Sequence, residues 1–268
     1  MIGQENLLKE IDKQIKQNTF PRFAILVGTR GSGKKLLANH IGEMLNAIVI
    51  ETGTGIDDVR AMIENTNKMV STTLHIIPDA DSMSIAARNA MLKVVEEPPN
   101  NAYFIMTLEN ENNTLSTIKS RGTTFNMDNY KADELALYSQ SLDLESKSKE
   151  IAVDLCDTPG ELNLLSSYDI EAFYDYVKLV VDNIAEVSGA NAFKIADKVA
   201  LKDGAEGYDL KLFWTAFIHN VVSNKDKKYW NAIPITDKAL QQLRIRGINR
   251  VFLMDKWILD VRQAWMEV

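Results

Sequence analysis

Cysteine and histidine are scarce in this sequence. Of 268 residues only Cys156 is a cysteine, so the chain cannot form an internal disulfide or supply four thiolates to a zinc ion. The three histidines, His40, His75 and His219, lie far apart and lack the spacing of metal ligands. We therefore expect no metal site, and a single thiol favours a reducing compartment.

Basic charge and long apolar runs are also lacking. Acidic side chains number 37 and basic side chains 30, a formal net charge of -7, so the chain as a whole does not attract a phosphate backbone. The first residues contain no apolar signal core, and runs such as Phe23–Val27 are far shorter than the ~20 residues of a membrane span. We expect a soluble cytoplasmic protein that touches nucleic acid only through a local patch or a partner.

The first 128 residues alternate short apolar runs with segments of helical length. The runs are Phe23–Val27, Ala47–Ile50, Leu74–Ile77, Tyr103–Thr107 and Thr123–Met127. Because helices cover both faces of a parallel sheet, this alternation predicts an α/β fold with five parallel strands. Ser84 is placed to cap one of the helices, and Pro98-Pro99 ends that helix.

Helical patterns replace the strand signals from about Lys131 onward. The expected helices span residues 131–142, 145–156, 160–166, 169–187, 190–200, 209–223, 235–246 and 249–266. The second half of the chain is therefore predicted to be all-helical.

A glycine-rich segment follows the first apolar run and opens a helix over Lys35 to Leu45. It reads Gly28-Thr29-Arg30-Gly31-Ser32-Gly33-Lys34-Lys35. Such a segment is typical of a phosphate-binding loop, in which backbone N–H groups and a helix N-terminus cradle the phosphates and a lysine reaches the terminal ones. A glycine-rich turn that binds nothing is the alternative. The candidate nucleotide-binding residues are Gly28, Gly31, Ser32, Gly33 and Lys34.

The groups that would hold magnesium are replaced. Lys35 stands where a Ser or Thr hydroxyl should hold the ion, and an ammonium cannot ligate a cation. Pro78 stands where an Asp is expected, and Asp79 where a catalytic Glu is expected. Because phosphoryl transfer depends on charge neutralisation by the metal, we expect no hydrolysis by this chain and assign Asp79 and Asp81 as solvated loop carboxylates. No cofactor is predicted, with ATP retained without turnover as the alternative.

Residues 79–99 carry the clearest family signature. This run ends in Asn89-Ala90-Met91-Leu92-Lys93-Val94-Val95-Glu96-Glu97-Pro98-Pro99 and resembles the clamp-loader branch of the AAA+ ATPases. Shorter segments match in register: Ile2-Gly3-Gln4-Glu5, Ile56-Asp57-Asp58-Val59-Arg60, Thr107 at the sensor 1 position, and Ser120-Arg121-Gly122 where the family has Ser-Arg-Cys. Thr158-Pro159-Gly160 resembles the turn that carries sensor 2 in subunits of the delta-prime type.

The resemblance implies three domains. A RecA-like AAA+ domain is expected over residues 1–128, a small helical lid over 129–167 and a helical collar over 168–268, through which subunits form an open ring. Three departures from the family pattern resemble a delta-prime subunit, which keeps the ATPase fold without the reaction: Lys35, Pro78, and Glu161 at the position where sensor 2 has Arg. The implied partners are an ATPase subunit, a delta-like subunit and the sliding clamp, with primer-template DNA contacted through the complex.

Arg121 is the catalytic residue that the resemblance implies. In the family, the Arg of Ser-Arg-Cys enters the nucleotide site of the adjacent subunit as a finger that stabilises charge on the transferring phosphate. A surface salt bridge is the alternative. We favour a non-catalytic clamp-loader subunit that supplies this finger during ATP-driven clamp loading in replication. The alternative function is an ATP-hydrolysing clamp-loader enzyme whose metal is held by Ser32 or Asp81.

The last expected helix carries an apolar stripe. Its members are Val251, Met254, Ile258, Val261 and Trp265, at alternating spacings of three and four. Packing onto Phe213, Trp214 and Phe217 would use most of this stripe, and a collar must also offer apolar surface to neighbouring subunits. The sequence does not divide the stripe between these two uses.

Overall fold

The computed structural model describes residues 2–110, 114–202, 205–243, 245 and 247–266. The chain forms two compact units. The N-terminal unit comprises Met1–Tyr138 with Asp157–Gly160, and the C-terminal unit comprises Ser139–Cys156 with Glu161–Val268. The division of the helical part into lid and collar stays a prediction.

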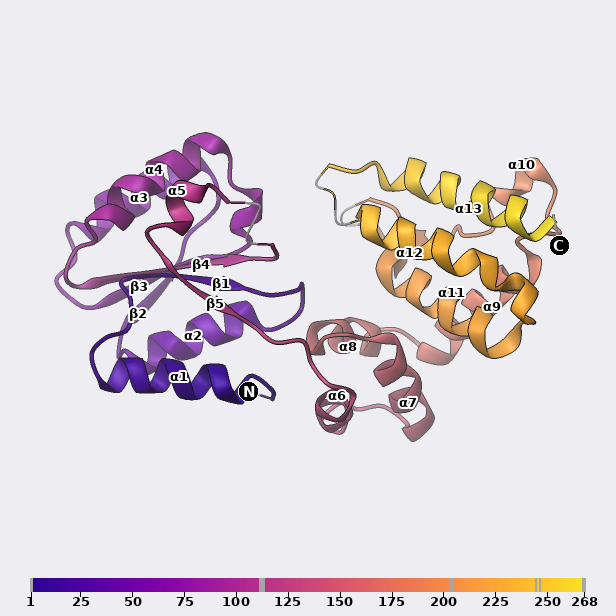
Figure 1. Ribbon diagram of the computed structural model, residues 1–268, viewed down its shortest axis with the longest axis horizontal. Helices are drawn as coiled ribbons and strands as arrows, with labels where there is room; N and C mark the ends of the chain where they lie inside the picture. Colours follow the sequence, from indigo (N-terminus) through magenta and orange to yellow (C-terminus); the bar gives the residue numbers. More distant parts are fainter. Residues whose placement is uncertain (1, 111–113, 203–204, 244, 246, 267–268) are drawn as a thin grey trace. The chain divides into compact units, whose positions relative to one another are not determined.

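A parallel sheet forms the centre of the N-terminal unit (Figure 1). Its strands are β1 (Phe23–Val27), β2 (Ile48–Glu51), β3 (Thr73–Ile77), β4 (Ala102–Leu108) and β5 (Thr123–Asn126). They lie in the order β2-β3-β4-β1-β5 with every pair parallel. The five predicted strands and the α/β fold class are thereby confirmed, and β1, which leads into the glycine-rich segment, lies between β4 and β5.

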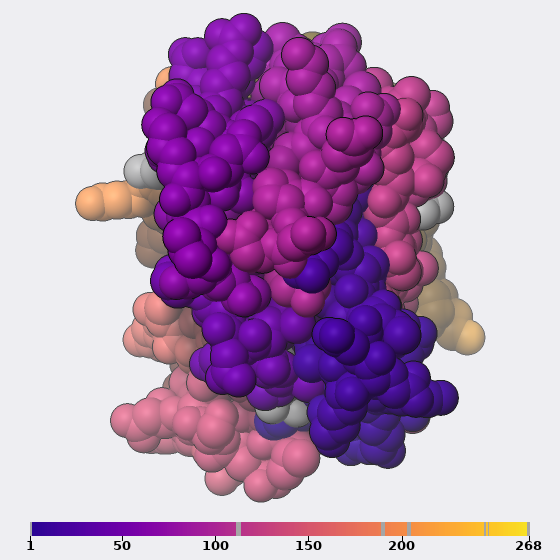
Figure 2. Space-filling model, turned by 90° about the vertical axis from the view of Figure 1, so that its left-hand side faces the viewer, coloured from indigo at the N-terminus to yellow at the C-terminus, as the bar shows by residue number. Residues whose placement is uncertain are grey.

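Helices cover both faces of this sheet. They are α1 (Glu5–Lys16), α2 (Lys34–Met44), α3 (Ile56–Thr66), the 3-10 turn η1 (Ala80–Ser82), α4 (Ile85–Glu96) and α5 (Ser116–Lys119), and α6 (Ala132–Ser139) follows β5. In Figure 1, α1 and α2 lie on one face and α3, α4 and α5 on the other. Successive side chains of β1 point to opposite faces of the sheet. Phe23 and Ile25 pack with α3 and α4, whereas Ala24 and Leu26 pack with α1 and α2. Figure 2 shows that residues from both layers reach the outer surface of this unit.

Local sequence signals set the ends of several helices. Ser84 precedes α4, and its hydroxyl accepts a hydrogen bond from the backbone N–H of Ala87 at 3.2 Å, as the predicted cap requires. Gly33 precedes α2 with a φ of 91°, a left-handed conformation that glycine adopts without steric cost. The glycine at this position therefore lets the chain turn from the loop directly into α2.

The C-terminal unit is mainly helical. Its helices are α7 (Ser146–Leu155), α8 (Pro159–Ser166, which begins in the N-terminal unit), α9 (Ile170–Asn183), α10 (Gly189–Ala192), α11 (Leu210–Asn224), η3 (Lys227–Asn231), α12 (Ala232–Leu243) and α13 (Arg250–Met266). Aromatic side chains fill its core: Trp257 of α13 contacts Phe213, Trp214 and Phe217 of α11. The predicted end of one helix at residue 246 lies outside the described residues.

The prediction of a helix over residues 190–200 is wrong. Only α10 is helical there, and Val199–Ala200 forms β6, which pairs in parallel with β7 (Tyr208–Asp209). The side chain of Tyr176 explains this difference: its hydroxyl donates to the carbonyl of Ile195 at 3.3 Å and accepts from the N–H of Lys198 at 3.1 Å. These tertiary hydrogen bonds replace helical ones, and burial of the hydroxyl raises the pKa of Tyr176 to about 12.

Within the part of the chain that the structure describes, no helix combines the length and apolar character that crossing a membrane requires.

Candidate functional site

The glycine-rich segment connects β1 to α2 at the carboxyl edge of the sheet. Residues that follow neighbouring strands meet at this edge. Asp79 and Asp81 follow β3, and Thr107 lies near the end of β4. The hydroxyl of Thr107 accepts a hydrogen bond from the N–H of Asp79 at 3.0 Å. The fold therefore brings the predicted loop, the acidic segment and the sensor 1 position to one edge.

Lys34 points inward at this edge. Its ammonium donates to the carbonyls of Gly28 at 2.8 Å and Thr29 at 2.9 Å, and the residue is 7% exposed. Burial lowers the pKa of Lys34, although the nearby carboxylates of Glu109, Asp79 and Asp81 oppose this shift. The lysine that would bind a terminal phosphate is thus hydrogen-bonded to carbonyls of the loop itself.

The turn at Thr158-Pro159-Gly160 packs directly on the loop. The N–H of Gly160 donates to the carbonyl of Gly31 at 3.0 Å, and the hydroxyl of Thr158 donates to the carbonyl of Arg30 at 3.3 Å. A Cβ atom at Gly160 would lie 2.4 Å from the Cα of Gly31. Only glycine allows this approach, so the turn and the loop form one packed structure.

Tyr130 makes a hydrogen bond to the loop, and Gln4 makes hydrogen bonds to the segment that follows β5; neither was singled out as a site residue from the sequence. The hydroxyl of Tyr130 donates to the carbonyl of Ser32 at 2.7 Å, and burial raises the pKa of Tyr130, which keeps this donor protonated. Gln4 makes a pair of hydrogen bonds with the backbone of Asp128, at 2.7 and 2.8 Å. Gln4 belongs to the quoted N-terminal segment, but nothing in the sequence links Tyr130 to the loop.

The residues expected to replace magnesium ligands have other partners. The ammonium of Lys35 lies 2.6 Å from the carboxylate of Glu51, at the end of β2. The hydroxyl of Ser32 is buried and donates to the sulfur of Met127 at 3.6 Å. The carboxylate of Asp81 accepts the backbone N–H groups of Glu109 at 2.7 Å and Asn110 at 3.4 Å.

The side chains at this edge do not fit a magnesium-nucleotide complex. Among the described residues, no group of three or more His, Cys, Asp or Glu side chains is arranged to hold a metal ion. Lys35 and Pro78 offer no oxygen ligand from their side chains, and Ser32 and Asp81 are engaged elsewhere. These four side chains, as they are placed here, therefore do not form a magnesium site.

Arg121 lies in a more open setting of the same unit. It follows α5, and its side chain is 34% exposed. Its guanidinium lies 2.5 Å from the carboxylate of Glu96 and donates to the carbonyl of Thr117 at 2.7 Å and the hydroxyl of Ser120 at 3.4 Å. The salt bridge considered as an alternative role thus exists, with the guanidinium still partly open to solvent.

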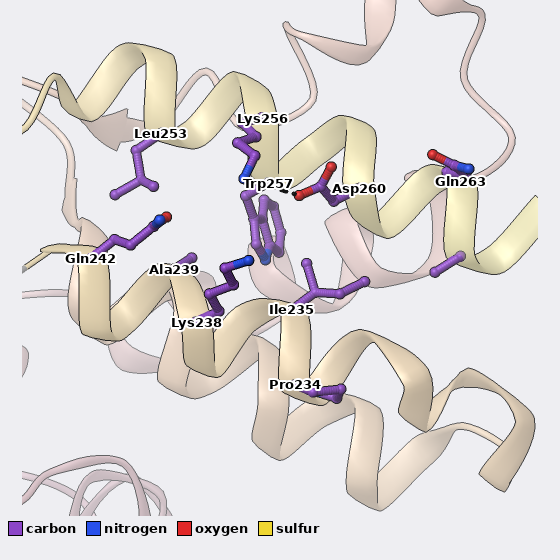
Figure 3. Close-up of a pocket in the computed structure, with 11 residues that line it drawn as sticks. Pro234, Ile235, Lys238, Ala239, Gln242, Leu253, Lys256, Trp257, Asp260 and Gln263 are labelled. Atoms are coloured by element: carbon purple, nitrogen blue, oxygen red, sulfur yellow. Dashed lines mark ion pairs between the residues drawn. The ribbon is translucent and has the colours of Figure 1, made fainter.

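Glu161, which stands at the sensor 2 position, pairs with Lys211 of α11 inside the C-terminal unit. A separate pocket of about 390 Å³ lies between α12 and α13 (Figure 3). Trp257 points into it from α13, and the ammonium groups of Lys238 and Lys256 lie beside the indole. The pocket includes none of the predicted site residues.

Comparisons with known proteins agree with the geometry of the N-terminal unit. A family model described as DNA polymerase III, delta subunit, matches residues 49–131, a stretch that includes Glu96 and Arg121. Replication factor C subunit 3 of Schizosaccharomyces pombe is 24% identical over 96% of this chain and 79% of that protein. DNA polymerase III subunit tau of Bacillus subtilis is 24% identical over 71% of this chain, which spans 40% of the tau subunit. These matches make the chain similar to clamp-loader AAA+ proteins.

Solved structures share the fold of this chain. A DNA polymerase III gamma subunit-related protein of Thermotoga maritima superimposes with a TM-score of 0.57 at 17% identity, over 96% of this chain and 99% of that one. The Holliday junction branch migration motor of the same organism gives a TM-score of 0.52 at 18% identity, over 83% of this chain and 76% of that one. These similarities place the sheet and the helices that follow it in the AAA+ architecture.

Proposed function

We propose that this chain is a non-catalytic subunit of a clamp loader of the DNA polymerase III type. In this role it takes part in ATP-driven loading of a sliding clamp onto primer-template DNA, as a cytoplasmic partner of an ATPase subunit and a delta-like subunit. Arg121 is the group that it contributes to the reaction, as a finger directed at the nucleotide of the neighbouring ATPase subunit.

The observation that carries this proposal is the difference between Lys34 and Arg121. Lys34 is buried and hydrogen-bonded to its own loop, whereas the guanidinium of Arg121 is partly exposed. A planar guanidinium with several donors suits the oxygens of a phosphate in another subunit. The match of residues 49–131 to the delta subunit model supports the same role.

The alternative, an ATP-hydrolysing enzyme with metal held by Ser32 or Asp81, has less support. The Ser32 hydroxyl is directed at Met127, and the Asp81 carboxylate accepts backbone N–H groups. Each would have to give up these contacts to reach a metal ion. The alternative therefore requires a rearranged loop as well as substituted ligands.

The surface that meets other subunits is proposed to include the outer face of α13. Phe252, Leu259 and Met266 are spaced by seven residues and are 66%, 51% and 70% exposed. The opposite face of α13, with Met254, Ile258, Val261 and Trp265, is buried in the unit. A regular apolar stripe on an exposed helix face is suited to packing against a helix of another chain.

The decisive experiment replaces Arg121 in a reconstituted complex. Arg121→Ala should leave assembly intact and lower DNA-stimulated and clamp-stimulated ATP turnover, because a finger supplied in trans contributes ~1000-fold or more at its one site. Arg121→Lys should fail nearly as badly, since an ammonium lacks the planar fork of a guanidinium. Arg60→Ala, on the exposed surface of α3, is the matched control. Normal turnover with Arg121→Ala would contradict the proposed finger.

A further inference from the structure

Glu96 is the charged residue that contacts Arg121. It is the last residue of α4, and its carboxylate lies 2.5 Å from the Arg121 guanidinium. Among the ion pairs of the described residues, Arg121 has no other acidic partner. Thr117 and Ser120 accept hydrogen bonds from the other terminal nitrogen. These three contacts leave further N–H donors among the five that a guanidinium carries. Arg121 is thus held through both terminal nitrogens and retains some of its N–H donors for another ligand.

The position of Glu96 in its helix is unfavourable on local grounds. Carbonyl groups at the end of a helix carry partial negative charge, which disfavours an acidic side chain in the last turn. Glu96 occupies this position in α4. A residue that breaks a local rule without an evident structural gain is a candidate for a functional role.

The ion pair itself contributes little to folding. The side chains of Arg121 and Glu96 are 34% and 47% exposed, and solvent screens an ion pair in such a setting. Its value lies in geometry, because a charged group that is already oriented needs no rearrangement when charge develops in the transition state.

We propose that Glu96 is a positioning residue that orients Arg121 for the nucleotide site of the neighbouring subunit. This inference rests on the proposed finger role of Arg121. Glu96 itself does not touch the nucleotide; it acts by fixing the guanidinium at the end of α5, from which the remaining donors reach the partner's phosphate. The expected consequence of losing Glu96 is a lower rate with unchanged nucleotide affinity.

The test uses Glu96→Gln in the reconstituted complex, with Glu97→Gln as the matched control. Glu97 is the adjacent exposed acid, and it forms no ion pair within the described part of the chain. Misplacing a catalytic group by about 1 Å can cost ~100-fold at its site, so Glu96→Gln should remove most of the turnover that Arg121→Ala removes. The loss should fall on kcat and not on KM. Glu96→Asp, which keeps the charge, should restore part of the rate, and Glu97→Gln should match the wild type.

A double variant separates positioning from a structural role. In the Arg121→Ala background, Glu96→Gln should cause no further loss of turnover, because the group that it orients is already absent. A further loss there, or an equal loss with Glu97→Gln, would overturn the positioning role. Full activity of Glu96→Gln beside an impaired Arg121→Ala would overturn it while leaving the finger intact. Full activity of Arg121→Ala would overturn the finger and the positioning role together.

Discussion

Lys34 and Arg121 are cationic residues of one unit with opposite surroundings. Lys34 is buried against the carbonyls of Gly28 and Thr29, whereas Arg121 is anchored by Glu96 and partly exposed. The comparison teaches that one unit can tie one cation to the carbonyls of its own loop and leave another cation partly exposed to solvent.

The largest expected effect comes from crowding the close contact between Gly160 and the loop. Gly160→Ala places a Cβ atom 2.4 Å from the Cα of Gly31, and such overpacking costs about 1–3 kcal/mol. Because alanine is the better helix former, a loss measured by urea unfolding would come from the lost close approach. Gly247→Asn is the control, since nothing lies within 4 Å of its Cβ and Asn tolerates a φ of 77°. Unchanged stability of Gly160→Ala would show that the turn does not pack tightly on the loop.

Lys34→Met tests whether the buried lysine stabilises the loop. The substitution keeps an unbranched side chain but leaves the carbonyls of Gly28 and Thr29 without the donor. An unsatisfied buried acceptor costs ~1–3 kcal/mol, so we expect the free energy of unfolding to fall by about 1–2 kcal/mol, measured by urea titration. A more stable variant would mean that the lysine is retained for a phosphate ligand instead.

The pH dependence of the unfolding free energy of the wild type and of Lys34→Met gives a second test. Burial holds the pKa of Lys34 below its ordinary value of 10.5. Between the folded-state pKa and 10.5 the unfolded chain binds more protons than the folded chain, so the unfolding free energy of the wild type should rise with pH in that window. The difference between wild type and Lys34→Met should therefore grow as pH approaches 10.5. A difference that shrinks would indicate that attraction by Glu109, Asp79 and Asp81 outweighs burial.

The smallest expected effect comes from restoring the missing magnesium groups. Lys35→Thr combined with Pro78→Asp supplies a hydroxyl and a carboxylate at the two expected positions. We expect no magnesium-dependent binding of a fluorescent ATP analogue and no turnover, because Lys34 and the turn at Gly160 still occupy the loop. The wild-type protein and the Lys34→Ala variant are measured beside it for comparison. Magnesium-dependent turnover by the restored variant would show that ligand loss alone silenced the site.

Sequence patterns predicted most of the fold. The five strands of the parallel sheet begin and end within one residue of the predicted ones, and Ser84 caps α4 as expected, whereas the short strands β6 and β7 were not predicted. Met254, Ile258, Val261 and Trp265 of the predicted stripe are buried, and Trp265 stacks on Phe217 of α11, but Val251 is exposed and most of the aromatic contacts with α11 come from Trp257, which the stripe did not include. These features depend on periodicity and capping, which are properties of neighbouring residues. The helix expected over 190–200 failed because Tyr176, outside that segment, supplies its hydrogen bonds.

The sequence by itself determined the residue types at the site. It contains the glycine-rich loop, Lys35 and Pro78 at the positions where magnesium-binding groups were expected, and Arg121 between Ser120 and Gly122. Only the tertiary structure decided what these residues do with their charges: Lys34 folds onto its loop, and Arg121 meets Glu96. Glu96 and Arg121 are separated along the chain by β4 and α5, and the packing of α5 against α4 brings them together. A contact of this kind depends on topology, which no local pattern of residues encodes.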